Sequence, residues 1–126
     1  MAPIRVQLSR AKGARLPPNT VKVDRSTRWG NPFTVNGCRE AGFSGSDAEI
    51  AARCVGAFKA WLGPYWRNNW DGTESARARA AILDNIADLR GKNLACWCAP
   101  GTPCHADVLL ALANGPICEA VERDHG

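Results

Sequence analysis

Three short stretches of the chain have the hydrophobic pattern of β-strands. Residues 4–8 (IRVQL) and 21–23 (VKV) alternate apolar and polar side chains, and residues 94–98 (LACWC) form a compact apolar run. Because the side chains of a strand point alternately to its two faces, these patterns are typical of strands in a small sheet. We therefore predict three short strands, the last of them central.

Two stretches in the middle of the chain carry apolar residues at helical spacing. The first begins after Ser46, which with Glu49 has the three-residue spacing of a capping box, and it ends at residues 63–64 (GP). The second covers residues 71–90, starts around residues 73–74 (TE) and ends at Gly91. The residues expected on the buried faces are Ile50, Cys54, Phe58, Trp61 and Leu62 in the first helix and Ile82, Leu83, Ile86 and Leu89 in the second.

A third helix is predicted directly after the last strand. Thr102 is a candidate N-cap, Pro103 suits the first helical position, and Gly115 with Pro116 ends the helix. The segment 93–114 is therefore a strand, a turn and a helix.

This strand–turn–helix gathers three cysteines and one of the two histidines of the chain within ten residues. Strand alternation places Cys96 and Cys98 on one face and Trp97 on the other. Cys104 and His105 are expected in the first helical turn, where the helix dipole favours a thiolate or a phosphate. If the chain has a chemical centre, we expect it here.

Three further segments have no clear period. Residues 24–33 (DRSTRWGNPF) are either a binding loop or a connection whose Trp29 and Phe33 enter the core. Residues 34–45 are rich in glycine and are predicted to be a loop or a short hairpin. The rings of residues 65–70 (YWRNNW) could stack on nucleic-acid bases, but we expect them to cap the end of the core.

These elements predict an α/β fold in which a short sheet is flanked by about three helices. The chain length of 126 residues suits a single domain, with a compact core over about residues 4–116 and a tail over 117–126 that includes His125. Ligands of open α/β sheets bind outside the carboxyl ends of the strands. The turn around Cys98 and His105 is expected to lie there.

Composition narrows the class of protein. The net charge of +4 permits an anionic ligand without requiring one, and no apolar run approaches the length of a membrane span. The first residues lack the apolar segment of a signal peptide, which predicts a cytoplasmic protein. In that compartment the six cysteines are expected to be thiols or metal ligands rather than structural disulfides.

The cysteine cluster suggests a zinc site. Cys96, Cys98, Cys104 and His105 are the donor set of a closed structural zinc site, although their spacing is tighter than in a usual zinc knuckle. Adjacent Cys and His residues on a helix would also point about 100° apart. The alternative is that Cys96 is simply a buried strand residue.

The same turn, together with residues 24–33, suggests a pocket for a nucleotide- or nucleoside-like anionic ligand. His105 is a candidate acid or base, Asp107 a residue that orients it, and Asp24 an alternative carboxylate, which leaves hydrolase or transferase chemistry open. His105 could instead only hydrogen-bond the loop. The candidate ligand-binding residues are Arg25, Arg28, Trp29, Gly30, Asn31, Phe33, Thr102 and Cys104.

The sequence is also compatible with two other functions. A zinc-stabilised module could bind nucleic acid or a host protein, through the basic residues Arg10, Lys12 and Arg15 or through the aromatic segment 65–70. Cys104 could be a reactive thiol activated by the helix N-terminus, but a cluster of three cysteines suits metal binding better. The sequence leaves the oligomeric state open.

The chain resembles the DUF4326 family of small bacterial and phage proteins. The resemblance rests on residues 21–25 (VKVDR), 29–33 (WGNPF), 89–92 (LRGK), 96–98 (CWC) and 104–109 (CHADVL). It extends from about Arg5 to Asn114, and it implies a single compact intracellular domain. It implies no particular activity, so it supports the choice of sites more than the choice of function.

Overall fold

The computed structural model describes residues 3–11, 13–68, 70, 72–99 and 101–115. Its sheet has three parallel strands, β1 (Arg5–Gln7), β2 (Thr20–Lys22) and β3 (Asn93–Cys96), in the order β1-β3-β2. The predicted central strand is therefore confirmed as central. Because all three strands are parallel, their carboxyl ends meet at one edge of the sheet, which we call the carboxyl edge.

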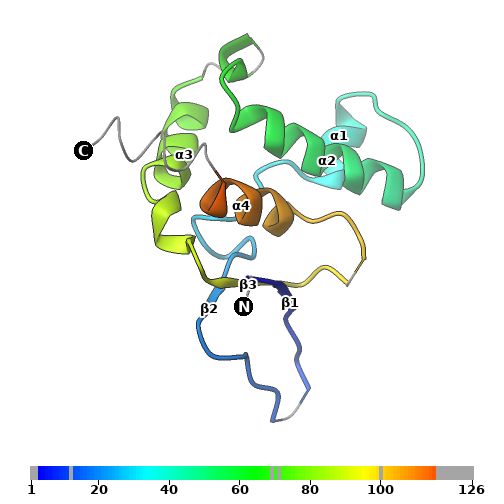
Figure 1. Cartoon of the computed structure of the whole chain (residues 1–126). Helices are drawn as coiled ribbons and strands as arrows, with labels where there is room; N and C mark the ends of the chain where they lie inside the picture. The colour runs from blue at the N-terminus through cyan, green and yellow to red at the C-terminus, as the bar shows by residue number, and fades with distance from the viewer. Residues whose placement is uncertain (1–2, 12, 69, 71, 100, 116–126) are drawn as a thin grey trace.

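In the described residues, four α-helices lie on one side of this sheet, and α4 packs directly on it. They are α1 (Val35–Glu40), α2 (Asp47–Trp61), α3 (Thr73–Leu83) and α4 (His105–Asn114), with the short 3₁₀ helices η1 (Trp66–Asn68) and η2 (Ile86–Leu89). In Figure 1 the helices lie on the same side of the strands, while the connection between β1 and β2 extends to the other side. Helix α4 packs on β3, β1, α2 and η2. The predicted α/β domain is confirmed, with four helices instead of about three.

The predicted start of α2 is confirmed in detail. The Ser46 hydroxyl accepts a hydrogen bond from the Glu49 amide, and the Glu49 carboxylate accepts one from the Ser46 amide, so both halves of the capping box form. The expected buried face is also present, because Ile50, Cys54, Phe58, Trp61 and Leu62 are all buried.

The prediction of a loop or hairpin over residues 34–45 was wrong. Thr34 caps a short helix there: its hydroxyl accepts a hydrogen bond from the Gly37 amide at 2.9 Å, and α1 runs from Val35 to Glu40. The glycines obscured this cap, since Gly37 lowers helix propensity at the third helical position. No residue of α1 is fully buried, so its apolar pattern is weak.

The second predicted helix, over residues 71–90, starts at Thr73 as predicted, but the prediction that it continues to residue 90 was wrong. Helix α3 ends at Leu83, and η2 follows after Asn85. The Asn85 side chain donates a hydrogen bond to the Ala81 carbonyl, and its own backbone leaves the helical region at φ −116°. Asparagine side chains compete in this way with the helical hydrogen-bond pattern. Ile82, Ile86 and Leu89 are nevertheless buried as expected.

The core lies between the sheet and the helices. Leu94 of β3 and Val23, directly after β2, meet Phe58 and Trp61 of α2 and Leu109 of α4. Each of these side chains is at most 1% exposed. Trp66 is buried against this core and Trp70 packs at its margin, so these two rings cap the core as predicted. For Tyr65 the prediction was wrong, because its side chain is 78% exposed.

In the described parts of the chain, no helix is both long and apolar enough to cross a membrane. Residues 117–126, predicted to be a tail, and the helix-ending Pro116 lie outside the described residues.

Candidate metal centre at the carboxyl edge

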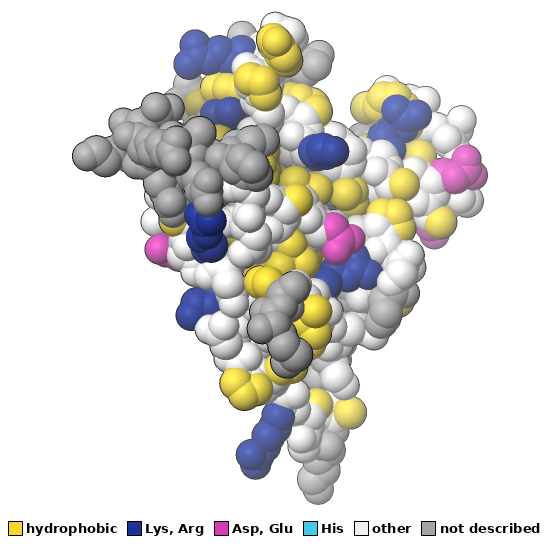
Figure 2. All heavy atoms as spheres, in the orientation of Figure 1, with side chains coloured by type: hydrophobic (Ala, Val, Ile, Leu, Met, Phe, Trp, Pro, Cys, Tyr) yellow, Lys and Arg dark blue, Asp and Glu magenta, His cyan; other side chains and the backbone are white. Residues whose placement is uncertain are grey.

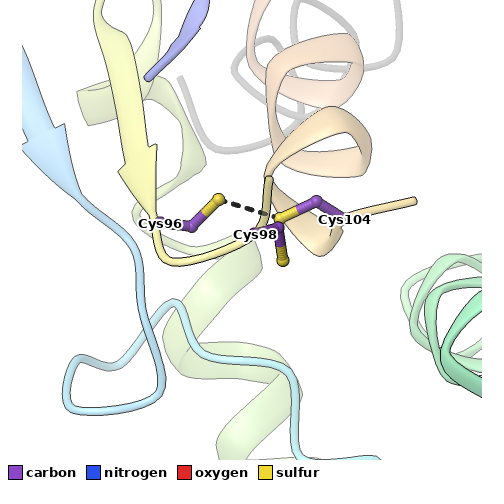
Figure 3. A group of neighbouring side chains, drawn as sticks. All are labelled: Cys96, Cys98 and Cys104. Atoms are coloured by element: carbon purple, nitrogen blue, oxygen red, sulfur yellow. Dashed lines mark hydrogen bonds between the residues drawn. The ribbon is translucent and has the colours of Figure 1, made fainter. Parts of the chain in front are cut away.

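Three cysteine sulfurs meet where β3 ends and α4 begins. The sulfurs of Cys96, Cys98 and Cys104 all lie within 4.8 Å of one another, and the Cys96 and Cys104 sulfurs are 2.9 Å apart (Figure 3). Cys96 is the last residue of β3 and Cys104 directly precedes α4, so the two ends of the turn converge. The arrangement provides three soft ligands for one metal ion.

The turn differs from its prediction in how the helix begins. Thr102 is not the N-cap and Pro103 is not helical, because α4 starts at His105 with Cys104 as N-cap. The Thr102 hydroxyl instead donates a hydrogen bond to the Ala99 carbonyl within the turn. Gly115 ends the helix as predicted.

This later start resolves the expected conflict between Cys104 and His105. Cys104 has an extended backbone, φ −150° and ψ 143°, so its side chain is not bound by helical geometry. Its sulfur lies 3.8 Å from the His105 Nδ1 atom. Two adjacent residues can therefore face one site, although two adjacent helical residues could not.

His105 is buried and held in one tautomer. Its Nε2 atom hydrogen-bonds the Val23 carbonyl at the end of β2, and Phe58 of α2 packs edge-on against the ring. Because a carbonyl oxygen can only accept, Nε2 carries the hydrogen and Nδ1 keeps its lone pair toward Cys104. Burial lowers the pKa of His105, with the Val23 hydrogen bond acting in the opposite direction. The imidazole is thus neutral, as a metal ligand must be.

The pKa values of Cys96 and Cys104 shift in opposite directions. The hydrogen bond from Cys104 lowers the pKa of Cys96 to about 6, although burial acts to raise it. That same hydrogen bond, together with burial, raises the pKa of Cys104. Cys104 is also only 1% exposed, so without a metal it has the properties of an inert thiol rather than a reactive one.

Arg5 holds the turn in place, although no pattern in the sequence marks it as part of the site. Its guanidinium donates to the carbonyls of Ala99 and Thr102 and pairs with the Asp107 carboxylate at 2.8 Å. Arg5 pairs in register with Leu94, so it points to the face that α4 covers. Its apolar neighbour Ile4 is 56% exposed, so apolar–polar alternation alone does not identify the face of β1 that α4 covers.

An open hollow of about 510 Å³ borders the cluster. It is lined by Arg5, Gln7, Cys98, Gly101, Thr102, Pro103 and Asp107. Cys98 is half-buried, so its sulfur is the one ligand candidate of the cluster that borders this space.

The segment 24–33 divides between the carboxyl edge and α2. Asp24 lies at the edge, where its carboxylate accepts a hydrogen bond from the Trp97 indole nitrogen at 3.2 Å. Arg25 donates to the Asn31 and Phe33 carbonyls, which folds the segment back on itself. A Cβ on Gly30 would lie 2.6 Å from the Arg25 Cα, so the chain passes too closely there for any side chain.

The remaining ligand candidates of this segment point toward α2 or solvent. The buried Asn31 amide donates to the Cys54 carbonyl and accepts from the Phe33 amide. Trp29 is 7% exposed in the core, and Phe33 packs against Trp61 and Trp70. Of the two alternatives for residues 24–33, the connection whose Trp29 and Phe33 enter the core therefore describes both rings. Arg28 is exposed. The structure thus brings Asp24 to the cysteine turn and places Asn31 and Phe33 beside α2.

Comparison with known proteins identifies the family. A family model described as a domain of unknown function (DUF4326) matches residues 6–115. The chain belongs to the DUF4326 family. No curated protein and no solved structure shows significant similarity to it. The match to DUF4326 contains every candidate site residue from Asp24 to Asp107, whereas Arg5 lies one residue before it.

A second feature of this DUF4326 protein was not predicted. The Trp97 side chain is 46% exposed, and the Arg10 guanidinium lies 5.0 Å from the centre of its ring. Arg10, Asp24 and Trp97 follow β1, β2 and β3 respectively, so residues after all three strands converge on one indole. Only the parallel order of the strands brings them together, and no local pattern in the sequence indicates it.

Proposed function

We propose that the protein is a zinc-binding domain in which Cys96, Cys98 and Cys104 bind one zinc ion. The observation that carries this proposal is the convergence of three sulfurs within 4.8 Å. Three thiolates, each about 2.3 Å from a tetrahedral zinc ion, have sulfurs about 3.8 Å apart. The sulfurs therefore need only small rotations to enclose an ion.

His105 is proposed as the fourth ligand through Nδ1. Metal-binding histidines commonly donate their other ring hydrogen to a carbonyl or carboxylate, which orients the ring. The Val23 carbonyl has this role for His105, and Nδ1 lies 3.8 Å from the Cys104 sulfur. To share one ion with all three cysteines, the imidazole has to approach the sulfurs of Cys96 and Cys98 as well. The extended backbone of Cys104 leaves the Cys104 sulfur free to adjust its position.

The proposed role of the ion is structural. The strands contain only three or four residues each, and the turn after β3 is fixed to the rest of the sheet chiefly through Arg5. An ion bound by Cys96, Cys104 and His105 ties the end of β3 to the start of α4. Three thiolates leave such a site with one negative charge, and the guanidinium of Arg5 is close enough to favour the Cys96 thiolate.

The test is the zinc content of the purified, untagged chain together with a count of reactive thiols before and after chelation. We expect one zinc ion per chain, and we expect Cys98, the half-buried thiol of the cluster, to become reactive only when zinc is removed. Cys98→Ser and Cys104→Ser should lose the zinc. Cys38→Ser, outside the cluster, is the matched control and should retain it.

Cobalt replacement tests the fourth ligand separately. Cobalt bound to the cluster should show thiolate charge-transfer bands, and His105→Ala should shift its visible spectrum if Nδ1 is a ligand. An unchanged spectrum would limit the protein ligands to the three cysteines. Absence of zinc, with Cys98 reactive from the start, would contradict the proposal as a whole.

A second candidate function is the binding of a nucleotide-like anionic ligand at the carboxyl edge. The observation that favours it is the half-exposed Trp97 between Arg10 and Asp24, because an indole beside a guanidinium suits a base and its phosphate. The negative charge of a zinc-loaded cluster would repel an anion, so the phosphate is proposed to lie toward Arg10. Acid–base roles for His105, Asp107 and Asp24 stay predictions.

This second candidate is tested by calorimetric titration with a nucleoside diphosphate. Trp97→Ala and Arg10→Ala should abolish saturable binding, whereas Tyr65→Ala, which removes an exposed ring elsewhere, should not change it. Binding only to oligonucleotides, with a steep dependence on salt, would favour nucleic acid instead. Figure 2 shows Lys and Arg side chains scattered over the visible face, which offers no single basic track there among the described residues.

A further inference from the structure

Two other cysteines form a separate sulfur pair on the far side of the core. Cys38 belongs to α1 and Cys54 to α2, and their sulfurs lie 3.4 Å apart. Neither belongs to the metal cluster. The pair lies between two helices that pack directly on each other, so its separation is set by that packing.

The separation is close to that of a disulfide. A sulfur–sulfur bond measures about 2.0 Å, so the two atoms have to approach by about 1.4 Å. Cys54 is held on the fifteen-residue helix α2, where its carbonyl also accepts the Asn31 hydrogen bond. Cys38 is on the six-residue helix α1, none of whose residues is fully buried. Small movements of α1 and rotation of the Cys38 side chain can therefore close the gap.

The two thiols differ in access. Cys38 is half-buried and borders a hollow of about 960 Å³, whose aromatic walls include Phe33, Phe43 and Trp70. Cys54 lies beneath it and is only 3% exposed. An oxidant that enters the hollow meets Cys38 first. Burial and the neighbouring Cys38 raise the pKa of Cys54 to about 11, which keeps Cys54 protonated until Cys38 has reacted.

We propose that Cys38 and Cys54 are a redox modification site, oxidised by small disulfides such as glutathione disulfide. The Cys38 thiolate attacks one sulfur of glutathione disulfide, forming a mixed disulfide and releasing one glutathione thiolate. Cys54 then loses its proton and attacks the Cys38 sulfur, which forms the Cys38–Cys54 bond and releases the second glutathione. Two protein thiols are oxidised and one glutathione disulfide is reduced to two thiols.

The bond would join α1 covalently to α2. Both helices border the hollow, so oxidation would add a covalent link to a wall that only non-covalent packing holds together in the reduced protein. The site is separate from the zinc cluster and does not depend on the proposed function. Zinc-bound thiolates would remain protected while this pair reacts.

The experiment treats the full chain, as purified, with glutathione disulfide, blocks free thiols by alkylation and maps the tryptic peptides. Trypsin separates Cys38 and Cys54 from the other cysteines: residues 29–39 contain only Cys38, residues 54–59 contain only Cys54, and residues 93–123 contain the three cysteines of the cluster together with Cys118. We expect a linked peptide joining 29–39 to 54–59, lighter by two hydrogens than the two peptides together. It should disappear on reduction.

Two variants make the result decisive. Cys54→Ala should trap glutathione on Cys38, because no second thiol can displace it, and Cys38→Ser should leave Cys54 unmodified. Retention of two free thiols in the wild-type chain at glutathione disulfide concentrations that oxidise a model dithiol would overturn the proposal. So would linkage of either cysteine to the 93–123 peptide, because it would show exchange without regard to the packed pair.

Discussion

At the scale of single residues, the role of a glycine depends on how closely other backbone atoms approach its Cα. Gly30 and Gly56 look alike in the sequence, yet a Cβ on Gly30 would lie 2.6 Å from the Arg25 Cα, whereas a Cβ on Gly56 would meet nothing within 4 Å. Arg25 folds the 24–33 segment through two carbonyls, so the glycine and the arginine act as one turn. Gly30 is therefore explained by packing of the backbone, without a ligand.

The two glycines predict opposite effects of the same substitution. Gly30→Ala should lower the free energy of unfolding by about 1–3 kcal/mol, because backbone atoms that cannot rotate away occupy the space. Gly56→Ala, in the middle of α2, should raise it by about 0.5–1 kcal/mol, because alanine is the better helix former. Urea unfolding of both variants measures the difference. Equal effects of the same sign would contradict this account.

At the scale of elements, helix ends were predictable where a side chain caps its own helix. Ser46 and Glu49 bond each other's amides, so their spacing alone located the start of α2. The start of α4 was not predictable, because Thr102 bonds Ala99 instead and Cys104 caps without a side-chain hydrogen bond. The interactions that hold that turn come from Arg5, about a hundred residues earlier in the chain.

Arg5 provides the prediction at this scale. Arg5→Ala should lower the free energy of unfolding by about 2 kcal/mol, because two turn carbonyls and Asp107 lose a charged donor. Arg5→Lys should rescue little of it, since one ammonium group cannot reach three acceptors in the geometry of the guanidinium fork. Arg28→Ala, at an exposed site, is the control and should change stability by less than about 0.5 kcal/mol. If Arg5→Ala left the free energy of unfolding unchanged, the hydrogen bonds of Arg5 would not be needed to hold the turn.

At the scale of the whole molecule, the residues of the candidate metal centre come together at the carboxyl edge of the sheet. The ends of β2 and β3 supply Val23 and Cys96, and α4 supplies His105, so the candidate metal centre exists only when these elements are packed. A zinc ion there would stabilise the native state in proportion to its binding free energy.

Zinc removal should therefore affect the molecule unevenly. We expect chelation to lower the melting temperature and to speed amide hydrogen exchange in β3 and the first turn of α4. The capped N-terminal half of α2, distant in sequence and fixed by its own capping box, should keep its protection at temperatures below the new transition. Uniform loss of protection would indicate global unfolding, and no change at all would argue against a structural ion.

The sequence by itself determined the local features: three short strands, the capped α2, the buried apolar faces, the cysteine turn and the resemblance to DUF4326. Each depends on neighbours a few residues apart, through strand alternation, helical spacing or capping. Only the tertiary structure decided that Arg5 faces α4, that Asn31 supports α2 and that Trp97 meets Arg10 and Asp24. The physical reason is that parallel strands join distant segments, and no local periodicity records which side chains then meet.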